Sequence, residues 1–178
     1  AEPCAPVMPD PDAAYVREVV LDVSTLSPRI ALPHAPVNVV PVEEVGEIPV
    51  QMVFLGTCTG GRVTDFRRVR EILEKGGGIA SGVHLVATPA SKNTYLELVE
   101  DGTVTKLIEM GALVTPPGCG ACCGTSGPVP GDGMNVLSTA NRNFKARMGN
   151  ATATIYLASP ATCAASAVTG VISDPREV

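Results

Sequence analysis

The sequence predicts a three-layer α/β/α domain, in which a mainly parallel sheet carries helices on both faces. Short, nearly continuous apolar runs alternate with segments whose apolar residues recur at helical spacing. The chain has 178 residues, of which 45% are hydrophobic and 17% charged. A chain of that length buries one core without disulfide bonds. We therefore expect one α/β domain rather than a bundle or an all-β fold.

The regular alternation of strands and helices begins at the apolar run QMVFL. This run is followed by the glycine-rich loop GTCTGGR. In the next segment the apolar residues recur at helical spacing, and three glycines end it. The strands expected from here on are 51–55, 83–87, 112–115 and 152–158. The helices expected between and after them are 63–75, 91–100, 104–110 and 161–171. Strand and helix alternate, as in βαβ units with a parallel sheet.

The N-terminal part of the chain is less regular. Residues 1–14 are rich in proline and are expected to be a flexible lead-in, with a single domain over 15–178. Tyr15–Val23 (YVREVVLDV) alternates between apolar and polar residues and is predicted to be a strand. The stretch 28–49 contains several prolines and is predicted to be an extended connection.

Composition and charge exclude several partner classes. The net charge is −5, and the 13 basic residues are spread thinly, so no basic patch marks the chain for nucleic acid or anionic membranes. Trp is absent and Phe and Tyr number three each, which disfavours base-stacking platforms. No apolar run has the length of a membrane span, and the N-terminus lacks a secretory pattern. We expect a cytoplasmic protein whose six cysteines are kept reduced.

Cysteines follow two of the predicted strands. Cys58 comes directly after strand 51–55, and Cys119 and Cys122 come directly after strand 112–115, within PPGCGACCG. The carboxyl ends of parallel strands meet at one sheet edge, where α/β proteins bind ligands. The glycine-, proline- and cysteine-rich segment 116–150 is also too long for a simple connection. The sequence therefore predicts three thiols together in a functional loop region.

Three thiols are one fewer than the four that close a structural zinc site or an ordinary iron–sulfur cluster. An open coordination position is what a catalytic metal needs. A redox CxxC pair and a structural zinc site remain alternatives. Cys123 is interpreted as a spare thiol beside Cys122, Cys163 as a buried apolar thiol in a helix, and Cys4 as part of the lead-in.

A second candidate group is the segment NRNFKARMG, which starts at Asn141. Arg142 and Arg147 bracket a short turn, and guanidinium groups are preferred partners of carboxylates. Asn141 and Asn143 can stabilise the turn or orient a ligand. From this segment by itself, a solvated loop with two surface arginines is the favoured interpretation.

With these motifs, the chain resembles the aconitase superfamily, most closely the 3-isopropylmalate dehydratase (isopropylmalate isomerase) large subunits and their homoaconitase and methylmalate-type relatives. The motifs are YVREVVLDVSTLSPRIALPHAPVNVVPV, VFLGTCTGGRVTDFR, PPGCGACCG and STANRNFKARMG, in that order. The resemblance implies a 4Fe-4S cluster held by Cys58, Cys119 and Cys122. It also implies that Arg142 and Arg147 bind substrate carboxylates, with Asn141 beside the cluster.

The family chemistry is dehydration and rehydration of a hydroxy di- or tricarboxylic acid, of the 2- to 3-isopropylmalate type used in leucine biosynthesis. Two departures from the family pattern concern substrate preference: Gly60 replaces the usual Asn, and Cys123 is an extra thiol. The resemblance covers only the cluster-bearing third domain. We therefore expect no catalytic base in this chain, no activity of the chain by itself, and partners in the remaining large-subunit domains and a small swivelling subunit or domain. A non-catalytic iron- or redox-sensing module is the alternative from another class.

Overall fold

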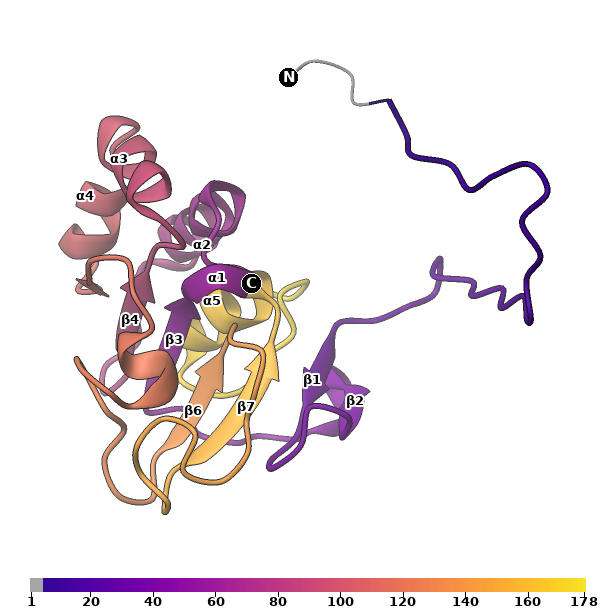
Figure 1. The fold of residues 1–178 in the computed structure, drawn as a ribbon. Helices are drawn as coiled ribbons and strands as arrows, with labels where there is room; N and C mark the ends of the chain where they lie inside the picture. Colours follow the sequence, from indigo (N-terminus) through magenta and orange to yellow (C-terminus); the bar gives the residue numbers. More distant parts are fainter. Residues whose placement is uncertain (1–4) are drawn as a thin grey trace.

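The computed structural model describes residues 5–178, which form one seven-stranded sheet with its helices (Figure 1). The strands are β1 (Arg29–Ala31), β2 (Val39–Pro41), β3 (Met52–Gly56), β4 (His84–Thr88), β5 (Leu113–Val114), β6 (Asn135–Ser138) and β7 (Thr154–Ala158). The α-helices are α1 (Thr57–Gly60), α2 (Val63–Gly76), α3 (Lys92–Glu100), α4 (Thr103–Glu109) and α5 (Pro160–Thr169). Two 3-10 helices, η1 (Val42–Glu44) and η2 (Gly120–Cys123), complete the elements.

The sheet is parallel over most of its width. Its strand order is β2-β1-β7-β6-β3-β4-β5, with β3, the most buried strand, between β6 and β4. Neighbours from β7 to β5 run parallel, while β1 is antiparallel to both β7 and β2. All five residues of β3 are buried, as expected for a strand covered on both faces.

The order of the strands decides which face each connection covers. The chain moves outward from β3 through β4 to β5, and then returns past β3 to β6 and β7. Parallel crossovers are almost always right-handed, so connections that move in opposite directions lie on opposite faces. The helices α2, α3 and α4 therefore cover one face. The segments 115–134 and 139–153 lie on the other face of the sheet.

The two apolar cores agree with this assignment. On the helical face, Val53, Leu55 and Leu85 pack with residues of α2, α3, α4 and α5. On the opposite face, Phe54 and Val86 pack with Ala121 and Cys122 of η2, and Met148 joins the same core. Because strand side chains alternate between faces, neighbouring residues of β3 contribute to different cores.

Most elements expected from the sequence are confirmed, and with them the α/β class and the mainly parallel sheet. On the second face, the described residues have η2 and its flanking loops, whereas α2, α3, α4 and α5 share the first face. The stretch 28–49 is not only a connection, because it contains β1, β2 and η1. Strand β6 was not expected, since it is short and lies inside the segment rich in glycine and proline.

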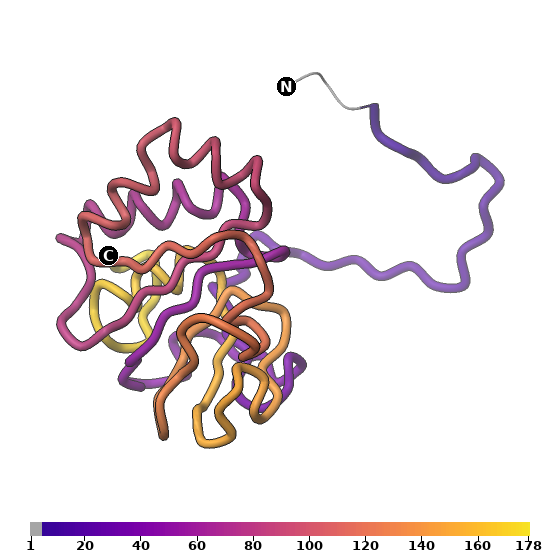
Figure 2. The backbone as a smooth tube through the Cα atoms, turned by 60° about the vertical axis from the view of Figure 1, so that its left-hand side comes forward, coloured from indigo at the N-terminus to yellow at the C-terminus, as the bar shows by residue number. Residues whose placement is uncertain are grey.

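The strand expected at Tyr15–Val23 is wrong. Residues 15–23 form no strand, and the whole segment 5–26 is exposed and projects away from the body (Figures 1 and 2). An alternating pattern makes a strand only where a neighbouring strand can pair with it. No strand of the described chain lies beside residues 15–23. Residues 1–4 of the expected lead-in, with Cys4, lie outside the described residues.

No helix in the described part of the chain combines the length and apolar character that a membrane span requires.

Candidate functional site

The candidate site lies at the carboxyl ends of β3 and β6, two adjacent parallel strands. From β3 the chain continues to the helical face, and from β6 it continues to the opposite face. Such a switch point leaves a crevice between the two departing loops, where α/β proteins bind ligands. The loop after β3 carries Cys58, and the loop after β6 carries Asn141 and Arg142. The topology thus brings together the two motifs that the sequence had placed far apart.

Cys58 lies on the single turn of α1, directly after β3, and its side chain is exposed. Hydrogen bonds with Thr59 and Thr57, whose hydroxyl oxygens lie 3.8 Å and 3.9 Å from Cys58 Sγ, lower the pKa of this thiol. The positive charge of Arg142 acts in the same direction. Cys58 is therefore accessible and disposed towards the thiolate, which is the form that binds metals.

Thr139 ties the loop after β3 to the end of β6. Its buried hydroxyl accepts a hydrogen bond from the Gly56 amide at 2.9 Å and donates one to the Gly56 carbonyl at 2.7 Å. Gly60 lies against the same side chain, and a Cβ built on it would be 2.5 Å from Thr139 Cβ. The conformation therefore leaves no space for the asparagine usual in the family at this position.

Cys119, Cys122 and Cys123 lie together at η2, in the loop that follows β5. Cys119 is exposed, Cys122 is buried and Cys123 is intermediate. The Cys122 amide donates to the Cys119 carbonyl at 2.8 Å, so the CxxC sequence forms one tight turn. A hydrogen bond with Thr125, whose hydroxyl oxygen is 3.2 Å from Cys123 Sγ, lowers the pKa of Cys123. The spare thiol is thus part of the same turn as the two predicted ligands.

Arg147 lies beside this turn, on the loop after β6. Its Nη2 donates to Cys122 Sγ at 3.6 Å, and its guanidinium carbon lies 5.7 Å from the centre of the Phe144 ring. Its Nε is buried and has no hydrogen-bond partner within residues 5–178. The sequence did not predict these contacts, because neither the CxxC motif nor the arginine motif indicates how the two loops fold onto each other.

The remaining residues of the arginine segment divide into two groups. Asn141 and Arg142 are exposed at the switch point. Asn143 is buried, and its Nδ2 donates to the Leu32 carbonyl at 2.9 Å, which ties the loop to the end of β1. Asn143 therefore stabilises the loop. Asn141 and Arg142 are the exposed polar residues of this loop next to the end of β6.

Cys163 lies away from the candidate site. Cys163 is fully buried in α5 among the helical-face core, and burial raises the pKa of its thiol. This confirms its interpretation as a buried apolar thiol. It lies on the face of the sheet opposite to η2.

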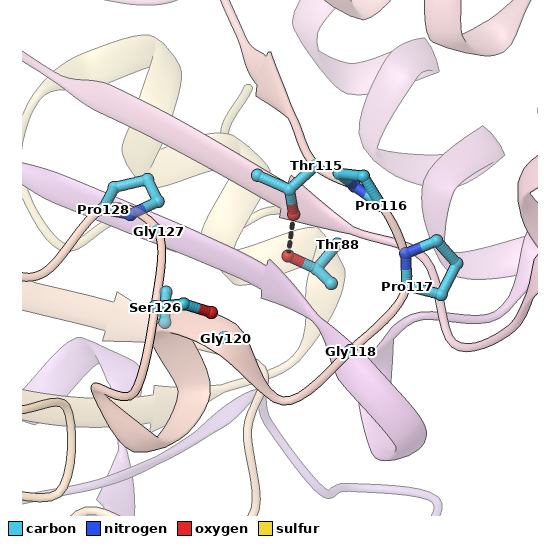
Figure 3. A pocket seen from close by; sticks show the side chains of 10 residues that line it. Thr88, Thr115, Pro116, Pro117, Gly118, Gly120, Ser126, Gly127 and Pro128 are labelled. Atoms are coloured by element: carbon cyan, nitrogen blue, oxygen red, sulfur yellow. Dashed lines mark hydrogen bonds between the residues drawn. The ribbon is translucent and has the colours of Figure 1, made fainter.

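A pocket of about 360 Å³ lies between the ends of β4 and β5 and the loop 116–128 (Figure 3). The hydroxyls of Thr88 and Thr115 form a 2.6 Å hydrogen bond at its floor, and prolines and glycines form much of its wall. None of the cysteines or arginines of the candidate site lines this pocket. It borders the loop that carries Cys119 without including the reactive groups.

The donors at the predicted site are thiols, which are the usual ligands of iron–sulfur clusters. Among residues 5–178, however, no three Cys, His, Asp or Glu side chains are grouped to hold a metal, so the structure does not bring Cys58, Cys119 and Cys122 into one closed set. The donors at the switch point and in the adjoining turn are thiols, with arginine cations beside them and no carboxylate hydrogen-bonded to them. Cluster irons are held by thiolates, whose negative charge such cations stabilise.

The family model of the aconitase family (aconitate hydratase) matches residues 3–170, which is nearly the whole chain. The chain therefore belongs to the aconitase family.

Among curated relatives, the chain is similar to large subunit 1 of 3-isopropylmalate dehydratase from Thermotoga maritima. The two are 53% identical over 169 residues, which are 94% of this chain and 40% of the relative. The Methanopyrus kandleri large subunit 1 of the same name is 48% identical over 96% of this chain and 41% of its own length. A probable methanogen homoaconitase large subunit from Methanosarcina mazei is 47% identical over 99% of this chain and 44% of its own length. The chain thus spans about two fifths of the length of these relatives.

Proposed function

We propose that this chain is the cluster- and carboxylate-binding domain of a hydro-lyase that isomerises a hydroxy di- or tricarboxylic acid. The observation that carries the proposal is that the loops of Cys58 and Arg142 leave two adjacent parallel strands, while Arg147 of the second loop contacts Cys122. Membership of the aconitase family and similarity to 3-isopropylmalate dehydratase large subunits support it. A homoaconitase-type substrate is the alternative that the Methanosarcina relative suggests.

In this proposal Cys58, Cys119 and Cys122 hold a 4Fe-4S cluster. Bound there, the cluster supplies a Lewis acid with one open position for a substrate hydroxyl and carboxylate. The chain's own contribution is to hold the thiols in place. The hydrogen bonds to Cys58 and Cys122 serve this purpose.

Arg142 is proposed to bind a substrate carboxylate. It is exposed at the crevice, no hydrogen bond of the described residues occupies its guanidinium, and its charge reaches Cys58. A free guanidinium can form two parallel hydrogen bonds with a carboxylate and so fix its orientation. Asn141 lies next to it and can donate an amide hydrogen. Arg147 can take part through the nitrogens that do not contact Cys122.

The proton-transfer group is proposed to come from outside this chain. No His, Asp or Glu side chain is bonded to the cysteine and arginine groups of the described site, so its residues bind and orient rather than exchange protons. We propose that the remainder of a large subunit and a small subunit complete the site, and that this chain by itself does not turn over substrate. Its exposed thiols suit a reducing compartment, hence a cytoplasmic location.

Substitution of one proposed ligand tests the cluster assignment. Anaerobic reconstitution of the chain with iron and sulfide should give a broad visible absorbance from thiolate-to-iron charge transfer. In Cys119→Ser this absorbance should be lost, because the hydroxyl is a much weaker ligand for iron than a thiolate. Cys163→Ala is the matched control, since it also removes one thiol but lies in α5, on the other face of the sheet.

Full absorbance in Cys119→Ser would contradict the ligand assignment. Loss of absorbance in Cys163→Ala to the same extent would also contradict it, because uptake would then depend on the number of thiols and not on their place.

A further inference from the structure

We propose that Arg147 is a positioning residue for Cys122, so that the two arginines of the NRNFKARMG segment have different roles. The inference rests on the proposed function, because it concerns how a cluster thiolate is held. The structure places Nη2 of Arg147 3.6 Å from Cys122 Sγ, as a hydrogen-bond donor. Arg142, five residues earlier in the sequence, has no such contact and stays free for a carboxylate.

The contact is built into the packing of two loops. Gly124, which ends η2, and Gly149, which follows Met148, lie so close that a Cβ on Gly124 would be 2.4 Å from the Cα of Gly149. Both glycines have positive φ, of 67° and 93°. Only glycine allows this conformation and this approach together. The arginine loop is therefore pressed against the cysteine turn by its backbone.

Side chains on either side of Arg147 fix its direction. Met148 is 1% exposed and packs in the same core as Ala121 and Cys122. The ring of Phe144 faces the guanidinium carbon at 5.7 Å, within cation–π range. The Arg147 amide also donates to the Phe144 carbonyl at 3.0 Å, which closes a tight turn. The guanidinium is thus held between an aromatic ring and a buried sulfur.

The burial of Cys122 makes this donor important. A thiolate in an apolar core is destabilised by the loss of water, and a charge-assisted hydrogen bond replaces part of that solvation. Cys122 is 5% exposed, whereas Cys58 and Cys119 are open to water. Arg147 therefore supports the one predicted ligand that water reaches least. Groups that hydrogen-bond to metal ligands commonly change metal affinity 10- to 100-fold when removed.

The test compares iron and sulfide loading of four forms of the full chain: wild type, Arg147→Gln, Arg147→Lys and Lys145→Gln. Lys145→Gln is the matched control, because it removes one positive charge from an exposed position of the same loop. Each loaded protein is treated with an iron chelator, and its reduction potential is measured by an electron paramagnetic resonance titration. Circular dichroism of the metal-free chains checks that each form folds.

Arg147→Gln is expected to release iron roughly 10-fold faster than wild type or more. Its cluster potential should also be more negative, because a hydrogen bond and a positive charge at sulfur stabilise the reduced state. Arg147→Lys keeps the charge and should lie between Arg147→Gln and wild type, and it provides the comparison if Arg147→Gln does not fold. Lys145→Gln should resemble wild type.

If the wild-type chain loads but the Arg147 variants match Lys145→Gln in release rate and potential, the role of Arg147 is wrong and the proposed function stands. If the wild-type chain takes up no iron and sulfide, the proposed function is wrong, and this role with it.

Discussion

At the residue scale, the two arginines of one short segment illustrate how neighbours in sequence separate in space. Arg142 is exposed at the end of β6 and its charge acts on Cys58, whereas Arg147 is half-buried and donates to Cys122. The turn between them, which includes Ala146 at a φ of 65°, reverses the chain. One arginine acts on the loop after β3 through its charge, and the other contacts the turn of η2.

Substitution of Arg142 separates an enzyme from a redox-sensing module. In a complete assembly of large and small subunits, Arg142→Ala should weaken the binding of a 2-hydroxy dicarboxylate by at least about 10-fold, because a charged hydrogen bond is lost. Isothermal titration calorimetry measures the change. Arg68→Ala is the control, since Arg68 lies on α2 and its hydrogen-bond partner is Glu71. Unchanged binding in Arg142→Ala would instead favour the sensing module.

The residue types of the site could be predicted from the sequence, but their division of labour could not. Cys58, Cys119 and Cys122 were predicted as ligands because they follow predicted strands, and β3 and β5 do end at the same edge of the sheet. In the described residues no three such side chains are grouped to hold a metal, so the ligand set stays a prediction. The Arg147–Cys122 contact depends on the approach of Gly124 and Gly149. A pair of glycines in separate loops gives no sign in the sequence that they touch.

At the scale of elements, local signals were reliable for the helices, where a cap or a helical periodicity was present, but not for the alternating pattern at 15–23. Ser91 caps α3 by accepting a hydrogen bond from the Thr94 amide, and Gly77 ends α2 in a left-handed conformation. Strand β6 lacks such signals, because it is four residues long and lies between loops rich in glycine. Its position beside β3 nevertheless creates the switch point, so the element hardest to predict is the one that positions the site.

The exposed segment before β1 gives the prediction at this scale. Six apolar side chains between residues 15 and 23 are 62% to 106% exposed, so they add little to the folded state of this chain. A chain that starts at residue 24 should have a free energy of unfolding within about 0.5 kcal/mol of the full chain, measured by urea denaturation.

Ile30→Ala is the matched comparison, because Ile30 is fully buried in β1 and its truncation should cost roughly 2–4 kcal/mol. A loss of similar size in the shortened chain would show that residues 15–23 pack against the domain after all.

At the scale of the whole molecule, the direction of chain travel explains the two unlike faces of the sheet. Steps from β3 to β5 place α2, α3 and α4 on one face, and the return to β6 and β7 places η2 and the arginine loop on the other. The sequence predicted the alternation of strands and helices, but not the point at which the strand order reverses. That reversal joins a cysteine loop and an arginine loop into one site.

The central claim is that these loops together hold an iron–sulfur cluster, and metal analysis of the chain purified under anaerobic conditions tests it most directly. The account predicts iron and acid-labile sulfide in equal amounts, with about four of each per fully loaded chain. Zinc bound to the chain, with neither iron nor sulfide, would contradict it.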